Sequence, residues 1–318
     1  MHVSDSMMQG AVCPVTALLS TAGLLVAGVA ASKSLRNPSA SLFGAVSAGL
    51  FAVQMLNVPL VAGVSGHVLG GVLASMLLGT PFGVLAMAVV VTLQALLFGD
   101  GGVMTLGANL LNMALLGAGV GGWLLNRCRA SGIGGWSWLL TTGLVSMVSV
   151  LIAAVAVTVE LAVSGTVSFT AVLPPMLGIH ALTGFGEGLL TALVAWFWFG
   201  VPQQHESAGG LLDEQGNRVF VTLFVAVTCA CCLSPFASAL PDGLEWVLHY
   251  HAVLPPDASM MGAPAWSSAG SIPVPFPDYR VPTVGNALLT TGFAGLLGVL
   301  ATFVAGCSAG RVLVYRSR

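Results

Sequence analysis

Charged residues are scarce in this chain. Only 6% of its 318 residues are Asp, Glu, Lys or Arg, and lysine occurs once, as Lys33. Soluble domains carry about 25% charged residues, so this chain has too little charge to cover a globular surface in water. Its hydrophobic fraction is 56% and its mean hydropathy is +0.96. These values predict an integral membrane protein, with the lipid bilayer as its main solvent.

The shortage of basic residues also argues against two functions. The net charge is −2 and no basic block occurs, which speaks against nucleic-acid binding. A phosphate-binding P-loop needs the pattern GxxxxGK[ST], and the only lysine, in VAASKS, lacks it. The chain is therefore not expected to hydrolyse ATP by itself. The Gly-rich segments FGDGG and GFGEG are instead predicted to permit turns or close helix contacts.

Signs of catalysis are missing as well. Glu187 is the single acidic residue deep in an apolar run, and no nucleophile–base pair accompanies it, so a structural role is predicted for it and no catalytic residue is assigned. The cysteines lie in or beside apolar runs and form no CxxC pattern, and the cluster Cys229-Ala230-Cys231-Cys232 is predicted to pack as small apolar residues. The six cysteines are Cys13, Cys128, Cys229, Cys231, Cys232 and Cys307.

Nine apolar runs are predicted to form membrane helices. They are residues 12–32, 41–62, 67–79, 82–98, 104–126, 134–160, 171–200, 219–239 and 284–307. The third and fourth runs are separated only by Thr80-Pro81 and are predicted to form a short helical hairpin. The fold class predicted is therefore an all-α integral membrane protein, a seven-helix bundle plus two additional transmembrane helices.

Basic residues orient these helices in a multi-pass topology. With the N-terminus outside, eight of the nine Lys and Arg residues fall on the inner side and only Arg280 remains outside. The positive-inside rule therefore predicts an external N-terminus and a cytoplasmic C-terminus in the cell (inner) membrane. Because the first residues contain Asp5 and no Lys or Arg, a retained first helix is expected in place of a signal peptide.

Polar stretches divide the chain into two parts. The segment VPQQHESAGGLLDEQGNR, 201–218, is predicted to be a cytoplasmic linker between a domain at 1–200 and a domain at 219–318. An external loop at 241–283, rich in proline and aromatic residues, is expected to join the last two helices.

Three histidines are predicted to gather at the outer face of the first domain. They are His2, His67 in SGHVLGG and His180 in GIHALTG. A single imidazole would most simply hydrogen-bond a neighbouring carbonyl, but three at a common depth favour a metal site.

Position 2 gives a histidine a particular chemistry. The terminal amine, the amide nitrogen of His2 and its Nδ1 atom can close two fused chelate rings, and a second imidazole can complete a square plane of nitrogens. Such a plane suits Ni(II) or Cu(II). It requires Met1 to stay attached, and a bulky residue such as histidine at position 2 generally protects the initiator methionine from removal.

Several segments resemble the nickel/cobalt-binding membrane subunit of energy-coupling-factor transporters, the CbiM/NikM family. They are MHVSD, the stretch 65–113 that begins SGHVLGG, and IHALTGFGEGLLTALV at 179–194. The resemblance implies seven helices with an external N-terminus, and Met1, His2 and His67 as the metal ligands. It also places Asp5, Ser65 and His180 near the ion. The opening His2-Val3-Ser4-Asp5-Ser6 departs from the family's usual His-Ile-Pro-Asp-Gly by losing the glycine.

The C-terminal part resembles the PDGLE domain that accompanies such subunits. The residues that carry this resemblance are ASALPDGLEWV, 237–247, and the segment 275–300 that begins PFPDYR. The resemblance implies an accessory role in nickel or cobalt uptake. His249 and His251 could capture metal in this part, although an ordinary pair of loop residues is the simpler interpretation.

The resemblance predicts the metal-binding subunit of an ATP-driven Ni²⁺ importer that works with a transmembrane coupling subunit and cytoplasmic ABC ATPases. Alternatives are the same role with Co²⁺, an ion-coupled permease that works alone, or a membrane protein that senses metal or scaffolds a complex. A secondary transporter would be expected to carry inverted repeats and charges at mid-membrane, and Glu187 is nearly alone there.

Overall fold

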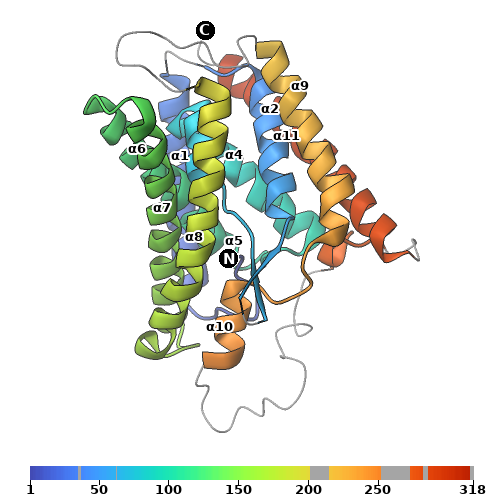
Figure 1. Ribbon diagram of the computed structural model, residues 1–318. Coiled ribbons are helices and arrows are strands. Elements are labelled where there is room, and N and C mark those ends of the chain that lie inside the picture. The colour runs from blue at the N-terminus through green and yellow to red at the C-terminus, as the bar shows by residue number, and fades with distance from the viewer. Residues whose placement is uncertain (35–36, 62, 201–214, 252–272, 282–285, 316–318) are drawn as a thin grey trace.

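The computed structural model describes residues 1–318 apart from 35–36, 62, 201–214, 252–272, 282–285 and 316–318 (Figure 1). The regular secondary structure of the described residues is helical except for one hairpin of two short antiparallel strands, β1 (Val58–Val61) and β2 (Val64–Gly66). The α-helices are α1 (Val12–Ser32), α2 (Ala40–Gln54), α3 (Gly71–Leu78), α4 (Thr80–Leu93), α5 (Leu106–Asn109), α6 (Gly121–Ala130), α7 (Gly135–Val163), α8 (Phe169–Phe199), α9 (Gln215–Thr228), α10 (Gly243–His251) and α11 (Ala287–Tyr315). Wider π-helical turns η1 (Gln94–Phe98), η2 (Leu110–Val120) and η3 (Cys229–Leu233) continue some of them, and η4 (Ser234–Phe236) and η6 (Pro277–Tyr279) are short 3₁₀ turns.

The prediction of an all-α membrane protein is confirmed. Seven helical stretches in the described chain are long and apolar enough to cross a membrane. They are Val12–Ser32, Thr80–Phe98, Leu106–Ala130, Gly135–Val163, Phe169–Phe199, Gly216–Phe236 and Leu288–Leu313.

Two predicted spans are corrected. The run 41–62 is helical only to Gln54 and then continues into strand β1, where Pro59 cannot donate the hydrogen bond that a helix needs. The run 67–79 begins with four residues outside any helix or strand, and its helix α3 has eight residues, about 12 Å of rise, which is too short to span a bilayer.

The helical hairpin exists, but its turn lies one residue earlier than predicted. Gly79 separates α3 from α4 with a φ of 88°, which favours glycine. Thr80 and Pro81 belong to the first turn of α4, a position that suits proline. A Cβ on Gly83 would lie 2.6 Å from Ser75 Cα, so glycine is what allows the two helices to approach.

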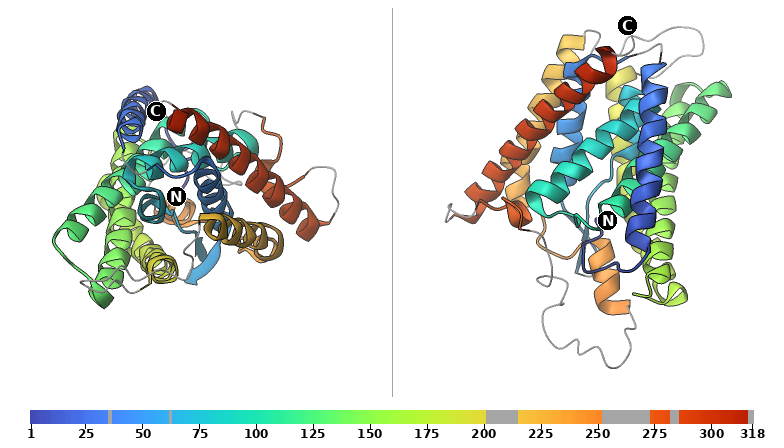
Figure 2. Two further views of the ribbon diagram at one scale, coloured as in Figure 1. Left: turned by 90° about the horizontal axis from the view of Figure 1, so that it is seen from above. Right: turned by 180° about the vertical axis from the view of Figure 1, so that it is seen from behind.

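The N-terminal residues and the end of α11 lie towards opposite ends of the bundle (Figures 1 and 2). The ends of α1, α6 and α11 and the start of α9 gather at one end, and the basic residues Lys33, Arg127, Arg129, Arg218 and Arg311 belong to these segments. The strands and α10 lie at the other end (Figure 1). This separation agrees with the predicted asymmetry of positive charge.

The last two long helices pack against α2 through small residues (Figure 2). A Cβ on Gly44 would lie 2.7 Å from the Phe303 carbonyl oxygen of α11, and a Cβ on Gly306 would lie 2.7 Å from Gly44 Cα. Close contacts of this kind hold helices together in lipid, where apolar burial gives little driving force. Helix α9 begins at Gln215, so the last four residues of the predicted linker are helical.

Candidate metal site

The first residues of the chain are buried. Met1 and His2 are 3% and 6% exposed, and they precede α1 as a loop folded back into the bundle. The Val3 N–H donates to Asn109 Oδ1 at 2.8 Å, and Asn109 Nδ2 donates to the Val3 carbonyl at 3.0 Å. Thr105 Oγ1 donates to the same carbonyl at 2.6 Å. These contacts fix the path of the dipeptide that was predicted to bind metal.

Asp5 secures this loop from the other side. Its Oδ1 atom accepts the Met104 N–H at 2.7 Å and the Thr105 N–H at 3.2 Å. The neighbouring Gly102 donates its N–H to the Val3 carbonyl at 2.9 Å, and a Cβ at this position would collide with the Asp5 side chain and backbone. The FGDGG segment therefore allows the close approach that its glycines predicted.

Glu187 positions the segment that carries His67. This buried carboxylate, on α8, accepts the Leu69 N–H at 2.6 Å and the Gly70 N–H at 3.1 Å. Both donors follow β2, where no regular ladder satisfies them. The predicted structural role of Glu187 thus has a definite form: it anchors the irregular backbone that follows His67.

The terminal amine meets His67. Its nitrogen lies 2.9 Å from His67 Nε2, while His67 Nδ1 lies 3.2 Å from the Val68 carbonyl oxygen. When Nδ1 donates to that carbonyl, Nε2 keeps a free lone pair directed at the amine. The amine also pairs with Asp242 Oδ2 at 2.8 Å, and this oxygen is 4.0 Å from His67 Nε2.

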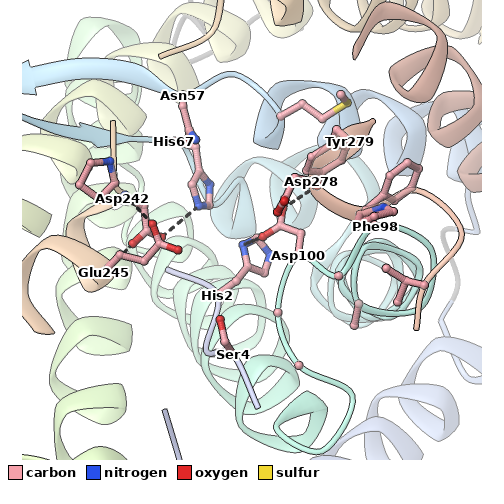
Figure 3. A pocket seen from close by; sticks show the side chains of 18 of the residues that line it. His2, Ser4, Asn57, His67, Phe98, Asp100, Asp242, Glu245, Asp278 and Tyr279 are labelled. Atoms are coloured by element: carbon pink, nitrogen blue, oxygen red, sulfur yellow. Dashed lines mark hydrogen bonds and ion pairs between the residues drawn. The ribbon is translucent and has the colours of Figure 1, made fainter. Parts of the chain in front are cut away.

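His2 lies beside His67 and faces a second carboxylate. The two imidazole rings stack with centroids 5.2 Å apart and an interplanar angle of 18°. His2 Nδ1 is 3.0 Å from Asp100 Oδ1, and His2 Nε2 is 3.2 Å from Gln94 Oε1. The Tyr279 hydroxyl donates to Asp100 Oδ2 at 2.5 Å. Asp242 and Asp100 lie on either side of the histidine pair (Figure 3).

The charges of the site shift its pKa values in opposite directions. Burial, followed by the charges of the terminal amine and His2, lowers the pKa of His67 to about 3. Burial opposes ionisation of Asp100, but the charge and hydrogen bond of His2 outweigh it and hold the pKa below its usual range. Burial likewise opposes ionisation of Asp242, but the positive charge of the terminal amine outweighs it and holds the pKa of this carboxyl below its usual range. The site thus holds a neutral imidazole between two ionised carboxylates.

A cavity of about 1100 Å³ opens onto these residues (Figure 3). Both parts of the chain line it, with His2, His67 and Asp100 from the first part and Asp242, Glu245 and Tyr279 from the last. Within the described residues no three His, Cys, Asp or Glu side chains form a ready-made metal cluster. The predicted ligand set differs from such a cluster, because it takes nitrogens from the terminal amine and a backbone amide.

The three residues predicted near the ion lie around the site. Asp5 anchors the N-terminal loop by accepting the Met104 and Thr105 N–H groups. Ser65 Oγ donates to the Leu240 carbonyl at 2.7 Å, which ties β2 to the last part of the chain. His180 Nδ1 lies 2.8 Å from the carbonyl oxygen of Met176, within its own helix. His249 lines the cavity, whereas the side chain of His251 lies outside the described part of the structure.

Four residues of the site were not predicted: Gln94, Asp100, Asp242 and Tyr279. Gln94 carried a usable signal, because it is an isolated polar residue in the apolar run VTLQALLF. The two aspartates occur in loops, and nothing in their local sequence indicates that they meet the N-terminus. Tyr279 lies in PFPDYR, where its partner Asp100 could not be inferred.

Comparisons with known proteins agree with this architecture. Residues 2–202 match the CbiM family, described as a cobalt uptake substrate-specific transmembrane region, and residues 216–315 match the PDGLE domain. The chain is 31% identical to a putative fused nickel transport protein NikMN of Archaeoglobus fulgidus, over 96% of this chain and 97% of that protein. It is 29% identical to a fused nickel transport protein NikMN of Rhodobacter capsulatus, over 96% of each.

A solved structure of a metal transporter also resembles this chain. The crystal structure of a truncated transition metal transporter superposes with a TM-score of 0.56 at 27% identity, covering 62% of this chain and 97% of that one. The match over 2–202 includes most of the chain, and the fused relative extends it over nearly the whole length. The chain therefore belongs to the CbiM family of metal-transport membrane proteins and carries a PDGLE domain at its C-terminal end.

Proposed function

We propose that this chain is the substrate-binding membrane subunit of an ATP-driven, energy-coupling-factor-type importer of Ni²⁺. The observation that carries this proposal is the separation of 2.9 Å between the terminal amine and His67 Nε2. Neighbouring nitrogens of a square plane, each about 2.0 Å from the metal, lie about 2.8 Å apart. An ion could therefore bind between these two atoms with little movement of either.

The proposed ligands are the Met1 amine, the amide nitrogen and Nδ1 of His2, and His67 Nε2. In the structure His2 Nδ1 faces Asp100, so the imidazole must turn about its Cβ–Cγ bond to complete the plane. His2 and His67 already stack side by side, which makes this a local rearrangement. Binding also displaces protons from the amine and the amide, so acid should weaken it.

The proposed membrane orientation follows from the distribution of basic residues, and the proposed ion follows from the names of the relatives. The site faces the outside of the cell and the basic end of the bundle faces the cytoplasm. Residues 1–200 bind the ion, 201–218 link the domains, and 219–318 form the PDGLE-type part. The chain lacks a P-loop, so a transmembrane coupling subunit and cytoplasmic ABC ATPases supply the energy. Two relatives are named as fused nickel transport proteins, which favours nickel over cobalt as the ion.

Calorimetry on the purified chain tests the site. His67→Ala removes one planar ligand and is expected to abolish tight Ni²⁺ binding while the protein remains folded. A glycine inserted between Met1 and His2 enlarges the chelate and should have the same effect. A glycine inserted after Asp5 is the matched control, because it lengthens the loop beyond the chelate. Unchanged affinity in the first two variants, or a mature chain whose N-terminus is trimmed or formylated, would contradict the proposal.

Uptake measurements test whether transport depends on the ATPase and whether the transported ion is nickel or cobalt. Labelled Ni²⁺ should enter cells only when the ATPase and coupling subunits are present. Uptake without them would indicate an independent permease, and no uptake in either case would indicate a sensor or scaffold. Preference for labelled Co²⁺ in the same assay would assign the subunit to cobalt.

A further inference from the structure

Asp242 belongs to the PDGLE motif of the C-terminal part, yet it contacts the terminal amine of the chain. The loop that carries it is tied to the first domain by backbone contacts. Ser65 donates its N–H to the Pro241 carbonyl at 2.9 Å, and the Ser238 N–H donates to the Asn57 carbonyl at 2.8 Å. The loop is therefore fixed against β2, which immediately precedes His67.

The two carboxylate oxygens of Asp242 have different partners. Oδ1 accepts the Glu245 N–H at 2.8 Å, and Glu245 Oε2 accepts the Asp242 N–H at 3.2 Å, which together cap α10. Oδ2 accepts from the Met1 amine at 2.8 Å. The cap holds the carboxylate in one orientation, and the second oxygen is thereby directed at the amine.

The amine needs such a partner. The Met1 nitrogen lies in a buried part of the chain, and its contacts in the described structure are Asp242 and His67. A buried positive charge without a carboxylate is strongly unfavourable. Once the amine has lost a proton and binds metal, it still carries N–H groups, one of which can continue to donate to Asp242.

We propose that Asp242 is a positioning residue for ion binding: by accepting from the Met1 amine, it holds this ligand beside His67 Nε2. The inference rests on the proposed function, in which the amine binds Ni²⁺. Carboxylates that orient metal-bound imidazoles act in this way, and their loss typically weakens metal binding roughly 10 to 100-fold. The PDGLE domain thus supplies part of the site in its own chain.

The test is Ni²⁺ calorimetry on the full-length chain with Asp242→Asn. Asparagine keeps an oxygen for the α10 cap and loses the ionised acceptor, so folding is preserved. We expect roughly 10 to 100-fold weaker binding and a lower unfolding temperature of the ion-free protein, because the buried amine loses its carboxylate partner. The ligand-field spectrum at saturating Ni²⁺ should also shift, because the amine is no longer oriented. Asp242→Glu should recover part of the affinity.

Glu245→Gln is the matched control for charge. It removes one negative charge from the same cap without touching the amine, and it should bind Ni²⁺ within about threefold of the wild type if positioning dominates. An Asp242→Asn affinity equal to the wild type, or equal to that of Glu245→Gln, would overturn the inference. Asp242→Ser, which also preserves the cap, repeats the measurement independently.

The inference can fail while the proposed function stands. His67→Ala is measured in parallel for this purpose. Loss of binding in His67→Ala together with wild-type binding in Asp242→Asn would reject only the positioning role. Wild-type binding in His67→Ala would reject the proposed ligand set itself.

Discussion

Tyr279 donates a hydrogen bond to Asp100 at 2.5 Å, and Asp100 in turn contacts the Nδ1 atom of His2. The C-terminal domain therefore reaches the N-terminal dipeptide by a second path, besides Asp242. Asp278 and Tyr279 have φ angles of 51° and 54°, which are uncommon for residues other than glycine. The tyrosine ring stacks on Phe98 at 4.7 Å, so packing holds the hydroxyl in this position.

Tyr279→Phe should strengthen Ni²⁺ binding about fivefold while the protein stays folded. The variant keeps the ring stacked on Phe98 and removes one hydrogen bond, worth about 1 kcal/mol, that holds Asp100 against His2 Nδ1, the contact that must break before this nitrogen can bind the ion. Calorimetry measures the affinity. Tyr250→Phe is the control, because Tyr250 lines the same cavity but is exposed and packs on Trp246. Equal effects of the two substitutions would refute a specific contribution of the Tyr279 hydroxyl.

Glu187→Ala should destabilise the protein and loosen the segment that carries His67. The substitution leaves the Leu69 and Gly70 N–H groups without their acceptor, at a cost of about 1–3 kcal/mol for each buried donor. Thermal unfolding in detergent and Ni²⁺ affinity should both decline. Ser146→Ala removes the 3.4 Å contact to the same carboxylate and a 3.1 Å contact to Thr191 Oγ1, but it leaves both backbone donors paired and should have a much smaller effect. If the two variants unfold at the same temperature, the anchoring role is wrong.

Gly102→Ala should disrupt ion binding. A methyl group at this position collides with Asp5 and would push the N-terminal loop away from its partners on residues 102–109. We expect at least a tenfold loss of Ni²⁺ affinity, because the loop also places the terminal amine. Gly186→Ala is the control, since a Cβ there meets no atom within 4 Å. Wild-type affinity in Gly102→Ala would show that the loop tolerates displacement.

The ion-free protein should lose stability as the pH falls from about 6.5. Unfolded His67 takes up a proton near pH 6.5, whereas burial and the nearby amine keep the folded residue neutral until about pH 3. Between these values the unfolded state binds more protons, so the free energy of unfolding decreases as the pH falls. His67→Gln removes the group that takes up this proton. The difference in unfolding temperature between wild type and variant should therefore change between pH 7 and pH 5, and parallel curves would contradict the assignment.

The membrane helices could be predicted because apolarity and length are local properties of the sequence. The two corrected spans show where this fails. Residues 58–61 are as apolar as a membrane helix, but their β-branched residues and Pro59 favour a strand, which a count of apolar residues does not distinguish. The run 67–79 contains Gly70, whose φ of 77° delays the start of the helix to Gly71.

The site was only partly accessible from sequence. Met1, His2 and His67 followed from the chemistry of position 2 and from the family resemblance, and their assignment as ligands remains a prediction. Asp100 and Asp242 could not be predicted, because Asp100 meets the dipeptide only where the N-terminal loop folds back onto the loop after η1, and Asp242 only where α10 docks on the first domain. That docking is set by packing over long sequence separations, which no short motif encodes.

The contact between α2 and α11 has a mechanical consequence. Gly44 and Gly306 bring the two backbones together, and the Cys307 side chain also lies against Gly44. A tilt of α2 is therefore expected to carry α11 with it, and the loop bonded to Ser65 should follow. A reorientation of this subunit in the bilayer should then move both domains together, with the carboxylates that face the ion travelling alongside it.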